Sequence, residues 1–189
     1  MESLLSEIKK CQVCLPFLNN GVNPVVSAHL NSKIAIIGQA PGSIVHKTGI
    51  PWDDQSGKRL RQWLNVSNET FYNPEIFALI PMGFCYPGKG KSGDLPPRPE
   101  CAPLYHNKLL DHMKKLELTI LIGNYAQSYY LGVQKGKTLT ETVKNYKNYL
   151  PGHLPLPHPS PRNNIWLKKN PWFVNDLIPV LQKKIRLVC

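Results

Sequence analysis

Residues 33–64, KIAIIGQAPGSIVHKTGIPWDDQSGKRLRQWL, decide the fold. They begin with the apolar run Ile34–Ile37, which is short and rich in β-branched residues, as in a strand buried on both faces of a parallel sheet. The segment Gly38–Gly42 (GQAPG) ends the run. Its two glycines allow the backbone to approach a ligand closely, and its proline fixes the shape of the loop. Because such loops bind ligands in open α/β sheets, the stretch predicts an α/β domain with a site at this loop.

The second half of the stretch places an aromatic ring beside two carboxylates. Trp52, Asp53 and Asp54 precede a segment with helical periodicity, for which Ser56 is the candidate N-cap. A stacking ring and an acid next to a preformed loop indicate a binding or catalytic site. The predicted helix buries Leu60, Trp63 and Leu64 and turns Lys58, Arg59 and Arg61 outward.

Three further apolar segments predict strands at Ile76–Met82, Leu118–Gly123 and His153–Leu156. Amphipathic segments between them predict helices, one of them opened by the capping box Thr138-x-x-Glu141. Strands that alternate with helices are typical of an α/β fold. We expect residues 1–189 to form a single domain, a three-layer α/β/α sandwich with a central, mostly parallel four-stranded sheet.

The chain is strongly basic, because 23 Lys and Arg against 12 Asp and Glu give its 189 residues a formal net charge of +11. An excess of this size favours an acidic partner, nucleic acid first, over a charge that serves only solubility. The first residues, MESLLSEIKKCQVC, lack a secretory apolar core, and no run approaches the length of a membrane span. We expect a cytoplasmic protein without a membrane partner, and we expect a monomer.

Five cysteines are too few for a secreted disulfide scaffold. Cys11 and Cys14 form a C-x-x-C pair after a predicted helix and just before a proline, which suits half of a metal site better than a thioredoxin-like redox pair. Cys85 and Cys101 flank a loop rich in Pro and Gly, and would complete four thiolates for a tetrahedral zinc or an iron–sulfur cluster. Ordinary buried thiols are the alternative. Cys189, at the chain end, is expected to take no part.

A second dense stretch, LPHPSPRN at residues 156–163, alternates prolines with His158, Ser160 and Arg162. The prolines predict a rigid, extended loop that presents these side chains with little entropy left to lose. The segment Gly88–Gly93 (GKGKSG) matches G-x-G-x-x-G, but two prolines follow where a dinucleotide site needs a helix. We interpret it as a basic loop that either contacts a DNA phosphate or is merely solvated.

Together, GQAPG, GIPWDDQSG and HPSPRN resemble the motifs of the uracil-DNA glycosylase superfamily. The four cysteines, with two residues inside the first pair and fifteen inside the second, are similar to those of its iron–sulfur branches, families 4 and 5. The segment Ile120–Ala126 is similar to a strand–helix unit of the family, so the resemblance covers most of the chain. It implies a DNA glycosylase that hydrolyses the N-glycosidic bond of a deaminated base in DNA, uracil first, in base excision repair. It also implies a 4Fe-4S cluster rather than zinc.

The resemblance further implies a role for each motif. Trp52 would stack on a base flipped out of the duplex, and His158 would hydrogen-bond the base oxygen where negative charge develops. Asp54, preferred to Asp53, would stabilise positive charge on the sugar or activate the attacking water. The substrate-binding residues would be Gly38, Gln39, Ala40, Pro41, Gly42, Trp52 and Asn163. The DNA-binding residues would be Pro157, Pro159, Ser160, Pro161 and Arg162, and the cluster ligands Cys11, Cys14, Cys85 and Cys101.

The chain departs from the family pattern at two places. Ala40 stands where the most studied members carry Asp or Asn, so the water-activating role lacks its usual residue. The segment Asp54–Gly57 is similar to the one that broad-specificity thermophile members use instead. Pro81 stands near the position of the asparagine that reads uracil in several branches. Discrimination would then come from Gln39, Asn163 or backbone groups, and could extend to hypoxanthine or xanthine.

These departures keep two other functions open. The first is a damaged-DNA-binding module that retains the fold and the pocket with weak or lost catalysis. The second is a nucleotide-binding or hydrolytic enzyme that acts on small substrates, against which the basic charge and the proline-rich loop argue.

Overall fold

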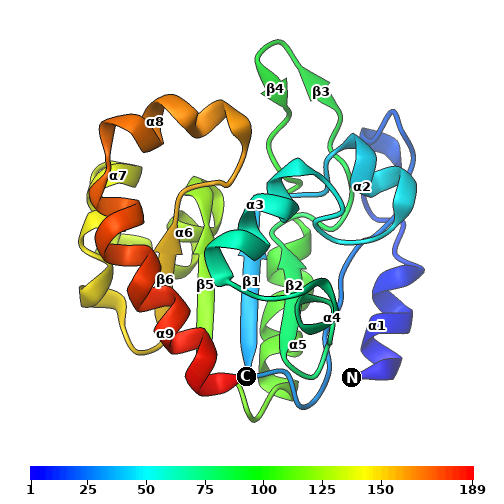
Figure 1. Cartoon of the computed structure of the whole chain (residues 1–189). Helices are drawn as coiled ribbons and strands as arrows, with labels where there is room; N and C mark the ends of the chain where they lie inside the picture. The colour runs from blue at the N-terminus through cyan, green and yellow to red at the C-terminus, as the bar shows by residue number, and fades with distance from the viewer.

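The computed structural model describes residues 1–189 and contains a four-stranded sheet in the order β2-β1-β5-β6, with every neighbouring pair parallel (Figure 1). All but the ends of two outer strands are buried, which explains their continuous apolar runs. The predicted strands are confirmed, and the sheet is parallel throughout. Its strands are β1 (Ile34–Gly38), β2 (Phe77–Pro81), β5 (Leu118–Ile122) and β6 (His153–Leu156).

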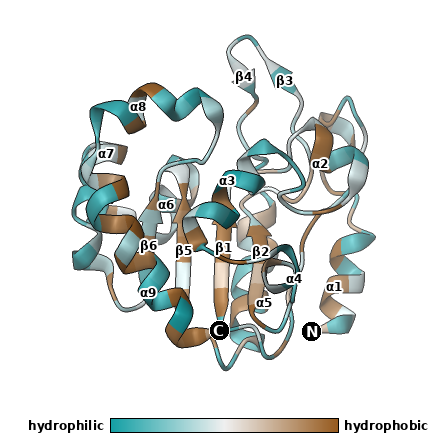
Figure 2. Ribbon diagram, in the orientation of Figure 1, coloured by the Kyte–Doolittle hydropathy of each residue, from teal (hydrophilic) through white to brown (hydrophobic).

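Helices cover both faces of this sheet. On β1, Ile34 and Ile36 point into a core shared with α3, α4, α7 and α9, whereas Ala35 and Ile37 point into a core shared with α1, α5 and α6. Figure 2 shows hydrophobic residues along the strands and on helix faces turned toward them. The three-layer α/β/α architecture is therefore confirmed. The helices are α1 (Glu2–Lys9), α2 (Ser43–Thr48), α3 (Gln55–Leu64), α4 (Asn68–Phe71), α5 (Asn107–His112), α6 (Gly123–Leu131), α7 (Leu139–Lys144), α8 (Asn164–Lys169) and α9 (Ile178–Val188).

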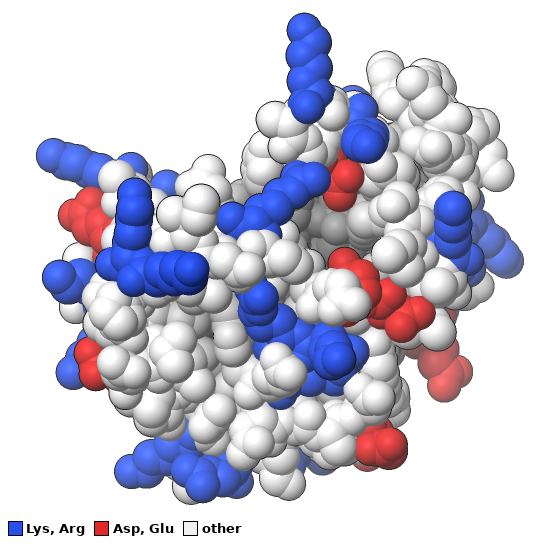
Figure 3. All heavy atoms as spheres, turned by 45° about the horizontal axis from the view of Figure 1, so that its top comes forward, with Lys and Arg blue, Asp and Glu red and all other residues white.

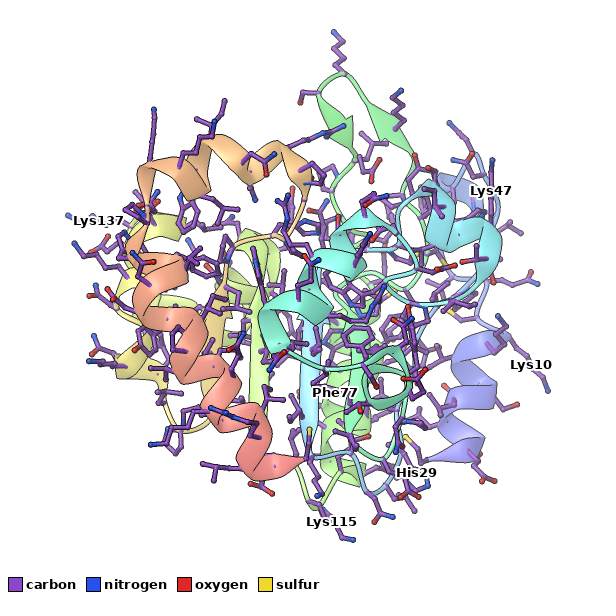
Figure 4. The ribbon with its side chains drawn as sticks, in the orientation of Figure 1. Lys10, His29, Lys47, Phe77, Lys115 and Lys137 are labelled. Atoms are coloured by element: carbon purple, nitrogen blue, oxygen red, sulfur yellow. The ribbon has the colours of Figure 1, made fainter.

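The carboxyl ends of the four strands meet at one edge of the sheet, the upper edge in Figure 1. A short antiparallel hairpin, β3 (Lys89–Gly90) and β4 (Gly93–Asp94), projects above this edge. The segment predicted only as a basic loop thus has a regular structure. Figure 4 places His29 and Lys115 at the opposite end of the molecule from the hairpin. None of the helices combines the length and the apolar character needed to cross a bilayer.

Candidate active site

A small pocket opens at the carboxyl ends of β1 and β2. The loop after β1 forms one wall, and the side chains of Trp52, Asp54 and His158 contribute to the others. The two dense motifs meet here although they are far apart in the sequence, because β1 and β6 run parallel and end at the same edge. The predicted base-binding residues that line this pocket are Gly38, Gln39, Ala40, Pro41, Gly42 and Trp52.

Trp52 has a left-handed backbone conformation, with a φ of 58°, that bulky residues rarely adopt. Two glycines make room for it. A Cβ on Gly38 would lie 2.8 Å from the Trp52 ring, and one on Gly57 would lie 1.7 Å from the Trp52 carbonyl oxygen. Arg61 donates hydrogen bonds from Nη1 to that oxygen (3.3 Å) and to the hydroxyl of Tyr72 (3.2 Å). The indole is thus held at the pocket by several independent contacts, as strained residues at functional sites usually are.

His158 lies beside this indole, with the ring centroids of Trp52 and His158 5.7 Å apart. The backbone N–H of Ser160 donates to His158 Nδ1 (3.2 Å), so a neutral imidazole carries its proton on Nε2. Burial lowers the pKa of His158, whereas the negative charges of Asp54 and Asp94 act to raise it. The lowering dominates, so His158 is a neutral ring that keeps an N–H donor at Nε2.

Asp54 lines both the pocket and an adjoining groove, whereas Asp53 lines neither. The Oδ1 of Asp54 accepts a hydrogen bond from the Gly57 N–H (2.8 Å), which makes Asp54 the N-cap of α3. The prediction that Ser56 caps this helix is wrong, because the chain is extended only as far as Asp54 and Ser56 is already buried in the first turn. The cap leaves Asp54 Oδ2 available to a bound molecule.

The adjoining groove is wider than the pocket and is lined mainly by polar residues. The loop after β6 forms one side. Within it, Asn163 donates from Nδ2 to the His158 carbonyl (2.7 Å), and Ser160 Oγ accepts from the Arg162 N–H (3.2 Å). Arg59 of α3 donates to the Ser160 carbonyl (3.2 Å). The loop is therefore fixed both internally and to α3.

The predicted DNA-binding residues of this loop differ in exposure. Pro157 and Pro159 are buried, whereas Ser160 is half-buried and Pro161 and Arg162 are exposed. Ser160 and Arg162 line the groove. Figure 3 shows the surface on this side as a hollow with basic side chains around it and acidic side chains at its rim. The groove thus combines a positive surround with a few negative charges.

The four predicted metal ligands gather around the base of the loop that carries the hairpin. Cys14 and Cys85 belong to one small buried cluster, and the Phe84 N–H donates to Cys101 Sγ (3.4 Å). Burial raises the pKa of Cys85 to about 11 and that of Cys101 to about 12, and Cys11 and Cys14 add to both effects electrostatically. No three His, Cys, Asp or Glu side chains are arranged to hold one metal ion. The structure therefore brings the four thiols near one another without converging them on a point.

An α/β domain with a narrow pocket lined by an indole and a neutral imidazole, opening into a wide polar groove, can hold one flat ring while the rest of a larger molecule lies outside. The architecture thus defines a class of protein that binds a single ring of a larger molecule. More narrowly, the chain belongs to the uracil DNA glycosylase superfamily, whose family model matches residues 25–182. The predicted family is thereby confirmed. The match includes both motif loops, Cys85 and Cys101, and leaves Cys11 and Cys14 outside.

The chain is also similar to the type-4 uracil-DNA glycosylase of Thermotoga maritima. The two are 26% identical over 164 residues, which make up 85% of this chain and 81% of that protein.

Two features of the site were not predicted. Arg59 and Arg61 were expected to face outward, but both are half-buried and donate to the backbone carbonyls of Ser160 and Trp52, respectively. Charge at an outward helical position gives no sign of such a contact. Asp94, the last residue of the hairpin, lines the groove. No pattern in the surrounding Gly- and Pro-rich segment indicates that this residue belongs to a site. Only the fold brings it to the site.

Proposed function

We propose that this protein is a monofunctional DNA glycosylase that excises uracil from DNA in base excision repair. The observation that carries the proposal is the meeting of Trp52, Asp54 and His158 at one pocket in a chain of the uracil DNA glycosylase superfamily. The name of the similar Thermotoga maritima protein supports uracil as the base. A cytoplasmic location and a monomeric state belong to the same proposal.

The pocket explains how a base is held outside the duplex. Flipping a nucleotide costs a few kcal/mol in lost stacking and pairing. Stacking on the indole of Trp52 offsets part of this cost, since a base–aromatic stack contributes about 1–3 kcal/mol. The left-handed backbone of Trp52 and its bond from Arg61 hold the ring in place before the base arrives. The site is thus preorganised for one flat ring.

The polar groups match the charges that develop as the bond breaks. When the bond between C1′ and the base nitrogen breaks, its electron pair leaves with the base, and positive charge remains on the sugar. Nε2–H of neutral His158 donates to the base oxygen that gains negative charge, as a donor in an oxyanion hole does. Asp54 lies where the pocket meets the groove, the place of the sugar, and its carboxylate stabilises the positive charge there.

The strand outside the pocket lies in the polar groove. Ser160 and Arg162 face this groove and hold phosphates on either side of the flipped nucleotide. Buried Pro157 and Pro159 keep the loop rigid, so its ordering adds little to the entropic cost of binding. The net charge of +11 adds a sequence-independent attraction for DNA.

Base discrimination relies on few side chains. Pro81 lines the pocket and offers no amide, while Asn163 uses its amide nitrogen on the His158 carbonyl. Gln39 lines the pocket and donates a long bond to the Leu95 carbonyl (3.4 Å). Backbone groups of the loop after β1, with Gln39, therefore carry most of the reading. Hypoxanthine and xanthine belong in the assay for this reason.

The four cysteines fit an iron–sulfur cluster. A 4Fe-4S cluster is larger than one ion and takes one thiolate at each corner, so its ligands need not converge on a point. The charges of three cysteines, Cys11, Cys14 and Cys85, act to raise the pKa of Cys101. The four thiols are thus neighbours and make up the donor set that such a cluster requires. Such a cluster would tie the segment before β1 to the loop after β2. Zinc is the less favoured occupant.

The test is a base-release assay on matched oligonucleotides that carry uracil, hypoxanthine, xanthine or only normal bases. We expect alkali-labile abasic sites with uracil and none with normal bases. Asp54→Asn should lower the rate by roughly 100-fold or more while DNA binding persists, because Asn keeps the helix cap and removes the charge. Absence of release from every oligonucleotide would contradict the proposal. Tight binding retained without release would instead support a damage-binding module.

A further inference from the structure

The β3–β4 hairpin is fastened over the active site by contacts with both motif loops. Gln39 of the loop after β1 donates from Nε2 to the Leu95 carbonyl (3.4 Å), and Arg162 of the loop after β6 donates from Nη1 to the Ser92 carbonyl (3.3 Å). The hairpin therefore forms the side of the groove opposite the loop after β6. Ser92, Gly93 and Asp94 all line the groove.

Asp94 is the acidic residue that this hairpin brings to the site. Its Oδ2 lies next to the end of the loop after β1, 3.7 Å from where a Cβ on Gly42 would stand. Its Oδ1 is 3.5 Å from the Tyr86 hydroxyl, a long contact that leaves the carboxylate mostly free. Asp94 and Asp54 are the two acids of the groove, and both act electrostatically on His158.

A carboxylate is unexpected on this surface. The chain has only 12 acidic residues against 23 basic ones, and a groove that accepts a phosphate backbone loses affinity with every negative charge in it. Asp54 is explained by the helix cap and by the sugar. Asp94 caps nothing and pairs with no cation. A role in the reaction would account for a charge that otherwise weakens binding.

The loop after β1 supplies no acid, although its residue Ala40 lines both the pocket and the groove. Asp94 approaches the same loop from the hairpin, at Gly42. The base lies in the pocket, so a water that attacks C1′ must come from the other side of the sugar, which is the groove. Asp54 lines pocket and groove, whereas Asp94 lines the groove alone. Both acids therefore border the groove, and Asp94 does so without lining the base pocket.

We propose that Asp94 is a second catalytic carboxylate, which holds the attacking water and accepts its proton. This inference rests on the proposed glycosylase function. The water oxygen forms a bond to C1′ as the bond from C1′ to the base nitrogen breaks, and the electron pair of that bond goes to the base. One water proton passes to Asp94 and then to solvent, and the released base takes up a proton from solvent. Asp54 stabilises the sugar charge, and Asp94 supplies the general base.

Three variants of the full chain test this assignment in single-turnover assays on a uracil oligonucleotide, with DNA binding measured in parallel. Asp94→Asn should lower the rate by about 100-fold or more, which is the usual contribution of a general base, with DNA affinity unchanged or higher. Tyr86→Phe removes the contact to Asp94 but keeps the carboxylate, and should stay within about threefold of the unmodified rate, well short of a general base. Formate should restore part of the rate to Asp94→Ala and none to Asp94→Asn, whose amide fills the space.

An Asp94→Asn rate within about threefold of the unmodified protein, below any general-base effect, would overturn the assignment. So would a loss that Tyr86→Phe shares, or a change in DNA affinity with no change in rate. Release by the unmodified chain together with full release by Asp94→Asn would overturn this inference and leave the glycosylase function standing. No release by the unmodified chain would overturn both.

Discussion

Gly57→Ala should disable the site through the backbone of Trp52, although it removes no side chain of the site. A Cβ on Gly57 would lie 1.7 Å from the Trp52 carbonyl oxygen, and ordinary contact begins near 3.4 Å, so the two atoms must separate by about 1.7 Å more. The helix cannot give way easily, because Gly57 is buried in its first turn and its N–H bonds to Asp54. The strain therefore falls on the peptide of Trp52.

The size of the effect follows from that displacement. A shift of about 1 Å in a positioned group can cost about 100-fold in rate, so Gly57→Ala should lower single-turnover base release by at least about 100-fold. It should also lower the free energy of unfolding by about 1–3 kcal/mol, the usual cost of overpacking. Alanine is the better helix former by about 1 kcal/mol, so a net loss of stability would itself indicate the clash.

Gly152→Ala is the matched control. A Cβ on Gly152 meets nothing within 4 Å, and the residue is exposed with no left-handed φ. This variant should keep the base-release rate and the melting temperature of the unmodified protein. If Gly57→Ala also kept both, the left-handed conformation of Trp52 and its role in positioning the base would be refuted.

Cys85→Ser should lower the melting temperature and abolish brown colour if Cys85 holds a cluster, whereas Cys189→Ser should do neither; an unchanged melting temperature in Cys85→Ser would count against ligation. Arg162→Gln should weaken DNA binding about equally for all sequences and reduce the salt slope by about one, and an unchanged slope would remove it from phosphate contact. Burial lowers the pKa of His106 to about 4, so as the pH falls the unfolded chain protonates this imidazole before the folded chain does. The free energy of unfolding is therefore unaffected by His106 protonation above pH 6.5, and it falls by about 3 kcal/mol as the pH drops from there toward 4. Thermal unfolding against pH should show a flatter profile for His106→Gln, and parallel profiles would contradict the argument.

Local pattern was enough to predict most of the sheet. The strands at residues 34, 77, 118 and 153 are apolar because both faces are covered, and this signal needs no knowledge of the neighbours. The predicted cap at Thr138 was also confirmed, since Thr138 Oγ1 accepts from the Glu141 N–H (3.1 Å), but the Glu141 carboxylate accepts from the Lys137 N–H (2.8 Å) rather than closing the box at Thr138. The cap of α3 was assigned to the wrong residue, because Asp54 and Ser56 are both good caps and only the backbone distinguishes them.

In the site, too, only the features that local sequence determines could be predicted. Glycine and proline fix the loops after β1 and β6 locally, so their motifs could be found in the sequence, and both loops do line one pocket. The parallel sheet determines that they meet. The role of Arg61 could not be predicted in this way. Arg61 contributes to the site by a hydrogen bond to the Trp52 carbonyl, whose direction is set by the unusual φ of Trp52. No periodicity encodes that contact.

The role that we propose for Asp94 would explain how an active-site acid can be missing from its usual segment. A carboxylate has to reach the reacting atoms, but the element that carries it is free to vary, provided that other contacts fix its position. Here Gln39 and Arg162 hold the hairpin from both sides, and Asp94 lies between those two contacts. Loss of the acid at Ala40 therefore need not mean loss of catalysis. Ala40 on its own would favour the inactive module, whereas Asp94 in the groove favours an enzyme whose second carboxylate comes from another part of the chain.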